Sequence, residues 1–381
     1  MWEHLTLDIL AHVFSFLPPD SLARAMIACK HWLACARSRA APPRHPPWLV
    51  AFPARAARGG PSCYAHDPAL HRWHVLPLDF LRCPLRLVAP VGGSLLCKLA
   101  SSSDLRLVLL NPFTRQFRHL PDLTTPRRNP AVGVVACGAD AAATFPSSFS
   151  VIVAGGASGS GYEPTVEMYD AGGGGWSPVG PMPVEFAVRL TVWTPNESVH
   201  ARDGALYWMT SARAYSVVGF DLRRRAWREV KAPMADRLEW ATLVPRPSGK
   251  LGLVGGAGSE QGTVWELTEG DDWVAVGRVP AELGKRFWRS GKEAATGGAT
   301  KCAGGEEAVY LFKDLSSDMM VWSESTSPPS SSSPLKKKEK EIKEWEWRLV
   351  EGQCSMPNIP IKAVLLHPML AVSPVSLRHS S

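Results

Sequence analysis

Apolar residues near the start of the chain recur with the spacing of an amphipathic helix. One stripe along residues 5–17 holds Leu5, Ile9, Leu10, Val13, Phe14 and Leu17. Pro18 and Pro19 end this helix, and the next apolar positions predict a second helix from near Leu22 to Trp32. The pattern therefore predicts a small all-α unit over residues 1–40, a helical hairpin with two to three helices.

Beyond residue 60 the pattern changes to short apolar runs separated by turn residues, which predicts β-strands. The 32 glycines and 33 prolines of the chain indicate many turns. Residues 41–60 are rich in Pro, Ala and Arg, and we interpret them as a linker with a first strand. An all-β domain is expected over residues 61–375.

The helical unit is too small to be self-sufficient, because about forty residues cannot bury a full hydrophobic core. Its surplus of apolar side chains therefore needs a second surface. That surface is either another protein or the following domain of the same chain. Periodicity alone does not distinguish the two.

The order of residues in this unit resembles an F-box. The resemblance rests on Leu5-x-x-Asp8-Ile9-Leu10, Val13-Phe14, Leu17-Pro18, Ser21-Leu22-x-Arg24 and Cys29-Lys30-x-Trp32, with the internal spacing intact. One departure is Thr6, at a position where family members usually have proline. The apolar stripe is unaffected by this difference.

The F-box resemblance implies that the unit binds a Skp-type adaptor, which connects it to a cullin–RING ubiquitin ligase. The positions that match the family motif are Leu5, Asp8, Ile9, Leu10, Leu17, Pro18, Leu22, Cys29, Lys30 and Trp32. Large apolar anchors on an exposed helical hairpin suit such an interface, which a few residues such as Trp32 should dominate.

Four segments of the β-rich region share one pattern, in which Asp or Asn stands six residues before an aromatic residue. The pairs are Asp67 and Trp73, Asn111 and Phe117, Asp170 and Trp176, and Asp221 and Trp227. Two further segments place Trp273 and Trp347 in the aromatic role, the first with Leu267 at the Asp position. Because Asp and Asn favour turns, each segment predicts a hairpin whose second strand starts at the aromatic residue.

Double glycines precede several of these hairpins, as in VIVAGGASG, LGLVGGAGS and KCAGGEEAVYLF, and suit close backbone approach near a central axis. Successive aromatic residues from Trp73 to Trp273 lie 44, 59, 51 and 46 residues apart. This set resembles kelch repeats, and six such units predict a six-bladed kelch-type β-propeller. The last step is longer because of a low-complexity insert over residues 324–344. The terminal segment IKAVLLHPMLAV is expected to close the ring on the first blade.

Charge and cysteine content limit the possible partners and locations. The net charge of +7 is spread thinly, without a basic stripe interleaved with aromatics, so we expect no nucleic-acid partner. The first residues lack a basic region, and no run of eighteen apolar residues occurs, so neither a signal peptide nor a membrane span is expected. The eight cysteines contain no C-x-x-C pair, which favours reduced thiols in an intracellular protein of the nucleus, the cytoplasm or both.

Three other features contain residue types that suggest a metal site, a phosphate-binding loop or a catalytic site, but their spacing does not support these sites. Cys63, His66, His71 and His74 have zinc-ligand character, but alternation along a strand would point them to opposite faces. The glycine stretch 155–161 lacks the Gly-Lys-Ser/Thr ending of a phosphate-binding loop, and neither G-x-S-x-G nor H-E-x-x-H occurs. We therefore expect no metal, no cofactor and no catalytic residue.

Together the two resemblances imply the substrate receptor of an SCF (Skp–cullin–F-box) ubiquitin ligase, whose propeller binds the target protein. Loops on one propeller face are the expected target-binding surface, with arginines beside aromatic residues as anchors. The candidates are Arg127, Arg128, Arg213, Tyr215, Arg237 and Trp240. Two alternatives stay open: a non-degradative kelch scaffold whose hairpin packs on its own propeller, and a propeller enzyme.

Overall fold

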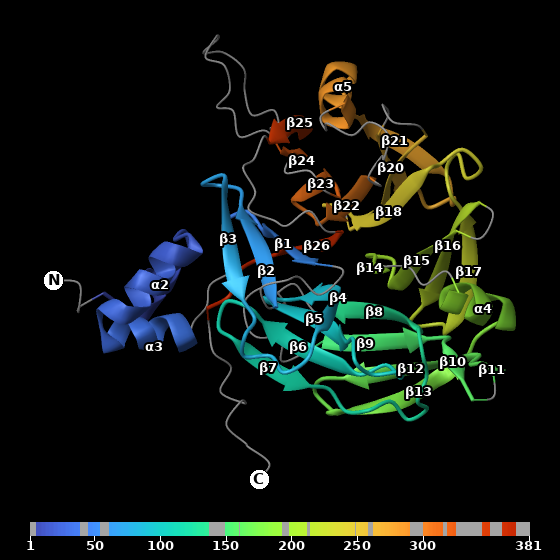
Figure 1. The fold of residues 1–381 in the computed structure, drawn as a ribbon, viewed down its shortest axis with the longest axis horizontal. Helices are drawn as coiled ribbons and strands as arrows, with labels where there is room; N and C mark the ends of the chain where they lie inside the picture. Colours follow the sequence, from blue (N-terminus) through green and yellow to red (C-terminus); the bar gives the residue numbers. More distant parts are fainter. Residues whose placement is uncertain are drawn as a thin grey trace.

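The computed structural model shows three short helices beside a ring of β-sheets (Figure 1). It describes residues 5–38, 45–53, 61–136, 149–159, 161–192, 198–211, 214–247, 249–257, 262–289, 300–314, 318–324, 345–350 and 360–370.

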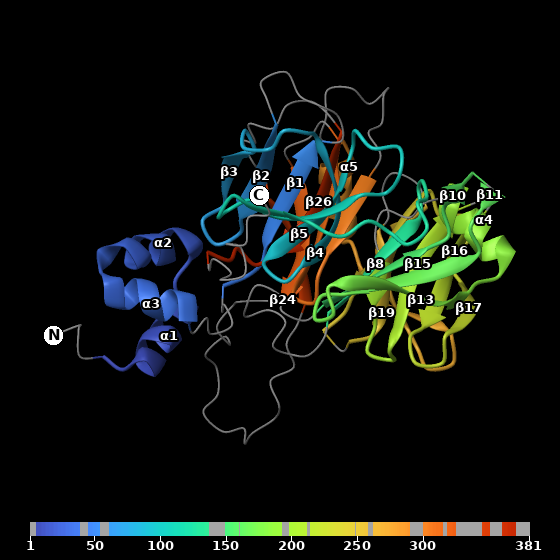
Figure 2. The same cartoon turned by 90° about the horizontal axis from the view of Figure 1, so that it is seen from below.

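The helical unit contains α1 (Leu7–Ser15), α2 (Pro19–Ala28) and α3 (Lys30–Ser38). Cys29 interrupts the predicted second helix with extended backbone angles, φ −158° and ψ 163°. The prediction of one continuous helix to Trp32 is therefore wrong, and Trp32 lies on α3. Side chains from the three helices form one core cluster of their own, with Leu10, Phe14 and Cys35 buried at its centre. The cluster lies to one side of the ring (Figures 1 and 2).

Within the described ranges, six four-stranded antiparallel sheets surround a common axis, as blades of a β-propeller (Figure 1). From the axis outwards, the first blade holds β26 (Ile361–Leu366), β1 (Trp48–Pro53), β2 (Ser62–Asp67) and β3 (Arg72–Pro77). The second blade holds β4 (Leu85–Val91), β5 (Ser94–Leu99), β6 (Leu107–Asn111) and β7 (Gln116–His119). The third blade holds β8 (Ala131–Ala136), β9 (Phe149–Ala154), β12 (Thr165–Asp170) and β13 (Gly175–Pro181). The prediction of a small helical unit followed by a six-bladed propeller is confirmed.

The other three blades repeat the same order. The fourth blade holds β14 (Ser198–His200), β15 (Ala205–Ser211), β16 (Tyr215–Asp221) and β17 (Ala226–Lys231). The fifth blade holds β18 (Trp240–Pro245), β19 (Leu251–Gly256), β20 (Thr263–Leu267) and β21 (Trp273–Arg278). The sixth blade holds β22 (Thr300–Gly304), β23 (Ala308–Lys313), β24 (Met319–Glu324) and β25 (Trp345–Val350). A small hairpin, β10 (Ala157–Ser158) with β11 (Gly161–Tyr162), extends the third blade. Helices α4 (Val184–Val192) and α5 (Ala281–Arg289) connect the third blade to the fourth and the fifth to the sixth.

The ring closes within the first blade, which takes strands from both ends of the β-domain. Strand β26 pairs antiparallel with β1 over its full length, from Trp48 opposite Leu366 to Pro53 opposite Ile361. The expected closing strand is therefore present. Strand β1 lies inside the segment interpreted from sequence as linker and first strand.

Turn chemistry explains the Asp/Asn-to-aromatic spacing, which marks the hairpin between the third and fourth strands of a blade. The Asp67 carboxylate accepts hydrogen bonds from the backbone amides of Ala69 at 2.8 Å and Leu70 at 3.3 Å. Asn111 and Asp221 make equivalent bonds two and three residues ahead. The residue four places on has a positive φ in five blades, at His71, Arg115, Gly174, Arg225 and Asp271. Four of these turns combine an accepting Asp or Asn side chain with a left-handed residue, whereas the turn of the fifth blade has the left-handed Asp271 but Leu267 at the accepting position.

The aromatic residues of the repeat fill the interfaces between neighbouring blades. Trp73, Phe117, Trp176, Trp227, Trp273 and Trp347 each pack into the core cluster between their own blade and the preceding one. In two of them the indole nitrogen also donates to a backbone carbonyl of that preceding blade: Trp176 to Pro121 at 2.8 Å and Trp273 to Lys231 at 2.9 Å. The fourth strand starts one residue before the aromatic in most blades.

The double glycines do not share one place in the blade, contrary to the expected pattern. Gly155–Gly156 and Gly255–Gly256 end or follow second strands, whereas Gly304–Gly305 ends the innermost strand β22. Close approach at the axis does occur at Gly304, where an added Cβ would lie 2.3 Å from Val244 of the neighbouring inner strand.

The low-complexity insert lies between β24 and β25, whose ends pair at Glu324 and Trp345. Residues 325–344 are outside the described part of the chain.

Candidate functional site

Helix α1 is apolar on two sides, and only one side is used by the core of the hairpin. Leu10 and Phe14 face inward and are buried. Ile9, Val13 and Phe16 remain 51%, 43% and 53% exposed. Because these three residues are spaced by four and three positions, they form one stripe along the helix, called the exposed stripe below. Exposed apolar side chains on one side of a helix are a candidate interaction surface.

The residues that match the F-box motif fall into three groups. Asp8, Ile9 and Lys30 are exposed, and Leu5, Leu17, Pro18, Leu22, Cys29 and Trp32 are half-buried. Leu10, in contrast, is only 1% exposed and belongs to the hairpin core. Its predicted place on the adaptor surface is therefore corrected to a supporting place beneath that surface.

Trp32 supports the same surface from α3. Its ring packs edge-on against Phe14 at 5.6 Å between centroids, and its backbone amide donates to the Cys29 sulfur at 3.4 Å. Sequence reasoning missed three exposed apolar residues as site candidates: Val13, Phe16 and Ile27, the last 84% exposed. The spacing of Val13 four residues after Ile9 was the signal that could have identified it.

Five of the six candidate target-binding positions lie in the described part of the chain, and these five fall on one face of the propeller. This upper face carries the loops that join one blade to the next and those that join second to third strands. Arg128 precedes β8, Tyr215 starts β16 and Arg237 precedes β18. Arg128 and Arg237 are exposed, Tyr215 is half-buried, and Arg213 lies outside the described residues.

Arg127 and Trp240 do not fit the predicted role, because both are buried. Arg127 is 0% exposed and forms an ion pair with Glu167, which is 3% exposed. Its Nη1 also donates to the carbonyl oxygens of Gly155 at 3.2 Å and Thr165 at 3.1 Å. Trp240 packs in the cluster between the fifth and sixth blades. Arg127 therefore connects the loop before β8 to the third blade, and Trp240 fills the interface between the fifth and sixth blades.

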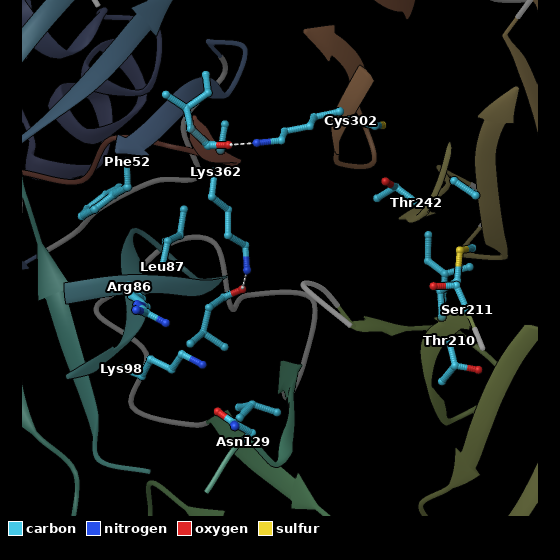
Figure 3. A pocket seen from close by; sticks show the side chains of 18 of the residues that line it. Phe52, Arg86, Leu87, Lys98, Asn129, Thr210, Ser211, Thr242, Cys302 and Lys362 are labelled. Atoms are coloured by element: carbon cyan, nitrogen blue, oxygen red, sulfur yellow. Dashed lines mark hydrogen bonds between the residues drawn. The ribbon is translucent and has the colours of Figure 1, made fainter. Parts of the chain in front are cut away.

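A cavity of about 700 Å³ opens at the centre of the upper face (Figure 3). The first residues of inner strands and the last residues of second strands line it. Arg86, Lys98 and Lys362 contribute positive charge on one side, and Lys301 contributes a fourth cation. The lining contains no Asp or Glu among the residues described.

The Cys/His group of the first blade is divided as strand alternation predicted. Cys63 lies in the cluster shared with the second blade. His66 faces the sixth blade, with its ring centroid 6.5 Å from that of Tyr310. In the described ranges, no three His, Cys, Asp or Glu side chains are grouped to hold a metal ion. Within the same ranges, no helix has the length and apolar character needed to cross a membrane.

Comparison with known proteins identifies the helical unit. Residues 2–40 match the family profile of F-box-like domains. The chain carries an F-box-like domain. Protein UNUSUAL FLORAL ORGANS of Arabidopsis thaliana is 24% identical over 348 residues, which cover 82% of this chain and 74% of that protein. The F-box/kelch-repeat protein At3g61590 of the same plant is 30% identical over 120 residues, which cover 30% of this chain and 28% of the relative.

Proposed function

We propose that this F-box protein is the target-recognition subunit of an SCF-type ubiquitin ligase. The F-box-like domain would bind a Skp-type adaptor, and the propeller would hold a target protein for ubiquitination. The observation that carries the proposal is an F-box-like hairpin with a partly exposed apolar stripe, joined to a six-bladed propeller.

The state of the exposed stripe favours an adaptor over intramolecular packing. In the non-degradative scaffold alternative, the hairpin would bury its apolar excess on its own propeller. The described hairpin core draws its residues from positions 5–36 alone, and Ile9, Val13 and Phe16 stay open to solvent. Large apolar side chains that stay exposed in this way suit a protein–protein interface.

The proposed mechanism is proximity and requires no covalent step in this chain. Holding a target close to the ubiquitin carrier of the assembled ligase raises the effective concentration of the target's lysines. The propeller's upper face, with Arg128, Tyr215 and Arg237, is the proposed target surface. The proposed compartment is the nucleus, the cytoplasm or both, where such a ligase would operate.

Co-purification with a Skp-type adaptor tests the proposal. The variant Ile9→Asp places a charge in the exposed stripe without touching the core, and we expect it to abolish adaptor capture. Val274→Asp is the matched control, because Val274 is also 51% exposed but lies on the outer strand of the fifth blade. It should capture adaptor like the wild type.

Two results would refute the ligase assignment. One is the absence of adaptor capture by the wild-type chain, and the other is equal capture by the wild type and the Ile9→Asp variant. If adaptor binds but proteasome inhibition enriches no ubiquitinated protein in proximity labelling around the wild-type chain, the scaffold alternative would replace degradation as the function.

A further inference from the structure

The small hairpin β10–β11 brings Arg128 and Tyr162 to one side of a short sheet on the upper face. Arg128 pairs with Ala157 through two backbone hydrogen bonds of 2.8 Å, and Ala157 pairs in turn with Tyr162. Directly paired residues of antiparallel strands point to the same face, so Arg128 and Tyr162 share one face with the small Ala157 between them. Two strand spacings separate their backbones, a distance of about 10 Å.

Both of these side chains are exposed to solvent. Tyr162 is 47% exposed, and Arg128 is also among the exposed residues. The exposed Arg115 and Arg228 each form an ion pair with an aspartate at 2.7 Å. Arg128, in contrast, forms no ion pair with a carboxylate of the described ranges. Its guanidinium is therefore available to the carboxylate of another molecule.

Helix α4 lies along the base of this hairpin, and Figures 1 and 2 both show the two elements side by side. Just before α4, the Met182 amide donates to the carbonyl oxygen of Pro164, just after β11, at 2.9 Å. Near the other end of α4, the Thr191 hydroxyl accepts a hydrogen bond of 2.7 Å from the amide of Gly156, just before β10. The helix is therefore held beside the hairpin at both of its ends.

The outward side of α4 is a row of valines. Val184, Val188 and Val192 are spaced by four residues and so lie on one stripe of the helix. Val184 and Val192 are 61% and 52% exposed, and Val188 is half-buried. Exposed apolar side chains that gather in this way mark a candidate interaction surface, unlike single exposed residues. Arg128, Tyr162, Val184 and Val192 are called the hairpin surface below.

We propose that the hairpin surface binds an extended segment of the target protein that carries an acidic side chain close to a large apolar one. This inference rests on the proposed function and specifies the chemistry of the target. The carboxylate accepts hydrogen bonds from Arg128, whose planar guanidinium suits a bidentate contact. The apolar side chain packs on Tyr162 and the valines, since arginine and tyrosine are frequent anchors of protein interfaces.

The distance between Arg128 and Tyr162 restricts the spacing within such a segment. An extended chain advances about 3.3 Å per residue, and every second side chain points to the same side. The acidic and the apolar residue are therefore two or four positions apart, because these spacings of about 7 and 13 Å bracket the separation on the hairpin. A basic residue in the acidic place is rejected, because like charges across an interface repel.

Selection from a random-peptide phage library on the full chain tests the proposal, followed by fluorescence polarisation with the selected peptides. We expect peptides with Asp or Glu two or four positions from Leu, Phe or Trp. The variant Arg128→Glu should weaken binding of these peptides at least about tenfold, because it replaces an ion pair by a repulsion. The same variant should regain binding when the acidic residue of the peptide is replaced by lysine.

Matched variants separate this contact from general effects of charge and folding. Arg118→Glu makes the same charge reversal at an exposed position on β7 of the second blade, and it should bind the peptides like the wild type. Tyr162→Ala should weaken binding, whereas Tyr162→Phe should retain it, because the ring supplies the apolar contact. All of these variants should melt at the wild-type temperature, since the changed side chains are exposed.

The proposal is overturned if no peptide is selected or if the selected peptides lack the acidic residue. Equal binding of the peptides by the Arg128→Glu and Arg118→Glu variants would also overturn it. Adaptor capture does not enter this experiment, so a negative result leaves the proposed ligase role standing. Peptide binding by a chain that captures no adaptor would instead refute the ligase role and leave the hairpin surface as a binding site.

Discussion

Replacement of Arg127 by methionine is the most direct test of whether this residue supports the fold or binds a target. The side chain is fully buried and donates to the carbonyl oxygens of Thr125, Gly155 and Thr165 as well as to Glu167. Removing one partner of a buried ion pair leaves an uncompensated charge and typically costs about 3–5 kcal/mol. The variant Arg127→Met keeps much of the apolar stem and removes the charge.

The Glu167 carboxylate would not be left without partners in this variant. It still accepts hydrogen bonds from the backbone amides of Thr124 at 2.8 Å and Thr125 at 3.2 Å. We therefore expect the lower end of the range, a loss of about 3 kcal/mol in the free energy of unfolding. For a domain of this size that corresponds to a decrease in melting temperature of roughly 4–5 °C.

Urea and thermal unfolding followed by tryptophan fluorescence measure this loss. Arg128→Met is the matched control, because it makes the same chemical change at the adjacent, exposed position. It should stay within about 0.5 kcal/mol of the wild type. Combining Arg127→Met with Glu167→Gln should cost less than the sum of the two single changes, because the residues share one interaction. Equal stability of the Arg127→Met and Arg128→Met variants would refute the structural role.

Two further predictions concern pH and ring closure. Burial, followed by the charge of His71, lowers the pKa of His66 to about 4 in the folded protein. The contribution of neutral His66 to the free energy of unfolding is therefore complete above the pKa of an unfolded histidine, near 6.5, and is lost as the pH falls toward 4. Urea unfolding should show a loss of about 2 kcal/mol between pH 7 and pH 5 that disappears in His66→Gln, and an unchanged pH dependence in that variant would contradict the assignment. Deletion of residues 361–381 removes β26, whose buried apolar side chains contribute roughly 6–12 kcal/mol, so size-exclusion chromatography should show aggregate instead of monomer. Deletion of residues 371–381 alone retains β26 and is the control; a stable monomer from the longer deletion would argue against closure by this strand.

Local chemistry explains which parts of the fold could be predicted from sequence. The Asp/Asn-to-aromatic hairpins could be predicted because the accepting side chain, the turn and the aromatic residue all lie within one segment of seven residues. The break at Cys29 was missed because it has an extended backbone without proline or glycine to indicate it. The sequence therefore left the number of helices at two or three, and the structure places the start of the third helix at Lys30.

Long-range pairing explains which parts of the site could not be predicted. Arg127 resembles a surface arginine in sequence, and its buried partner Glu167 is 40 residues away. The cationic side of the cavity combines β4 and β5 with β26, which the ring brings together from the far end of the chain. The adaptor surface was more predictable, because its residues lie on consecutive helices. Even there, helical periodicity did not separate the buried Leu10 from the exposed Ile9.

The shared first blade has a consequence for the time course of synthesis. Strand β1 leaves the ribosome early, but its inner neighbour β26 follows only after the five other blades, roughly 15–60 s later at ordinary elongation rates. During that interval the helical hairpin is complete while β1 presents an unpaired edge to the cell. A chain whose translation stops before Ile361 would thus carry a complete helical hairpin and an incomplete propeller. Its first blade would keep the exposed strand edge that quality-control machinery recognises.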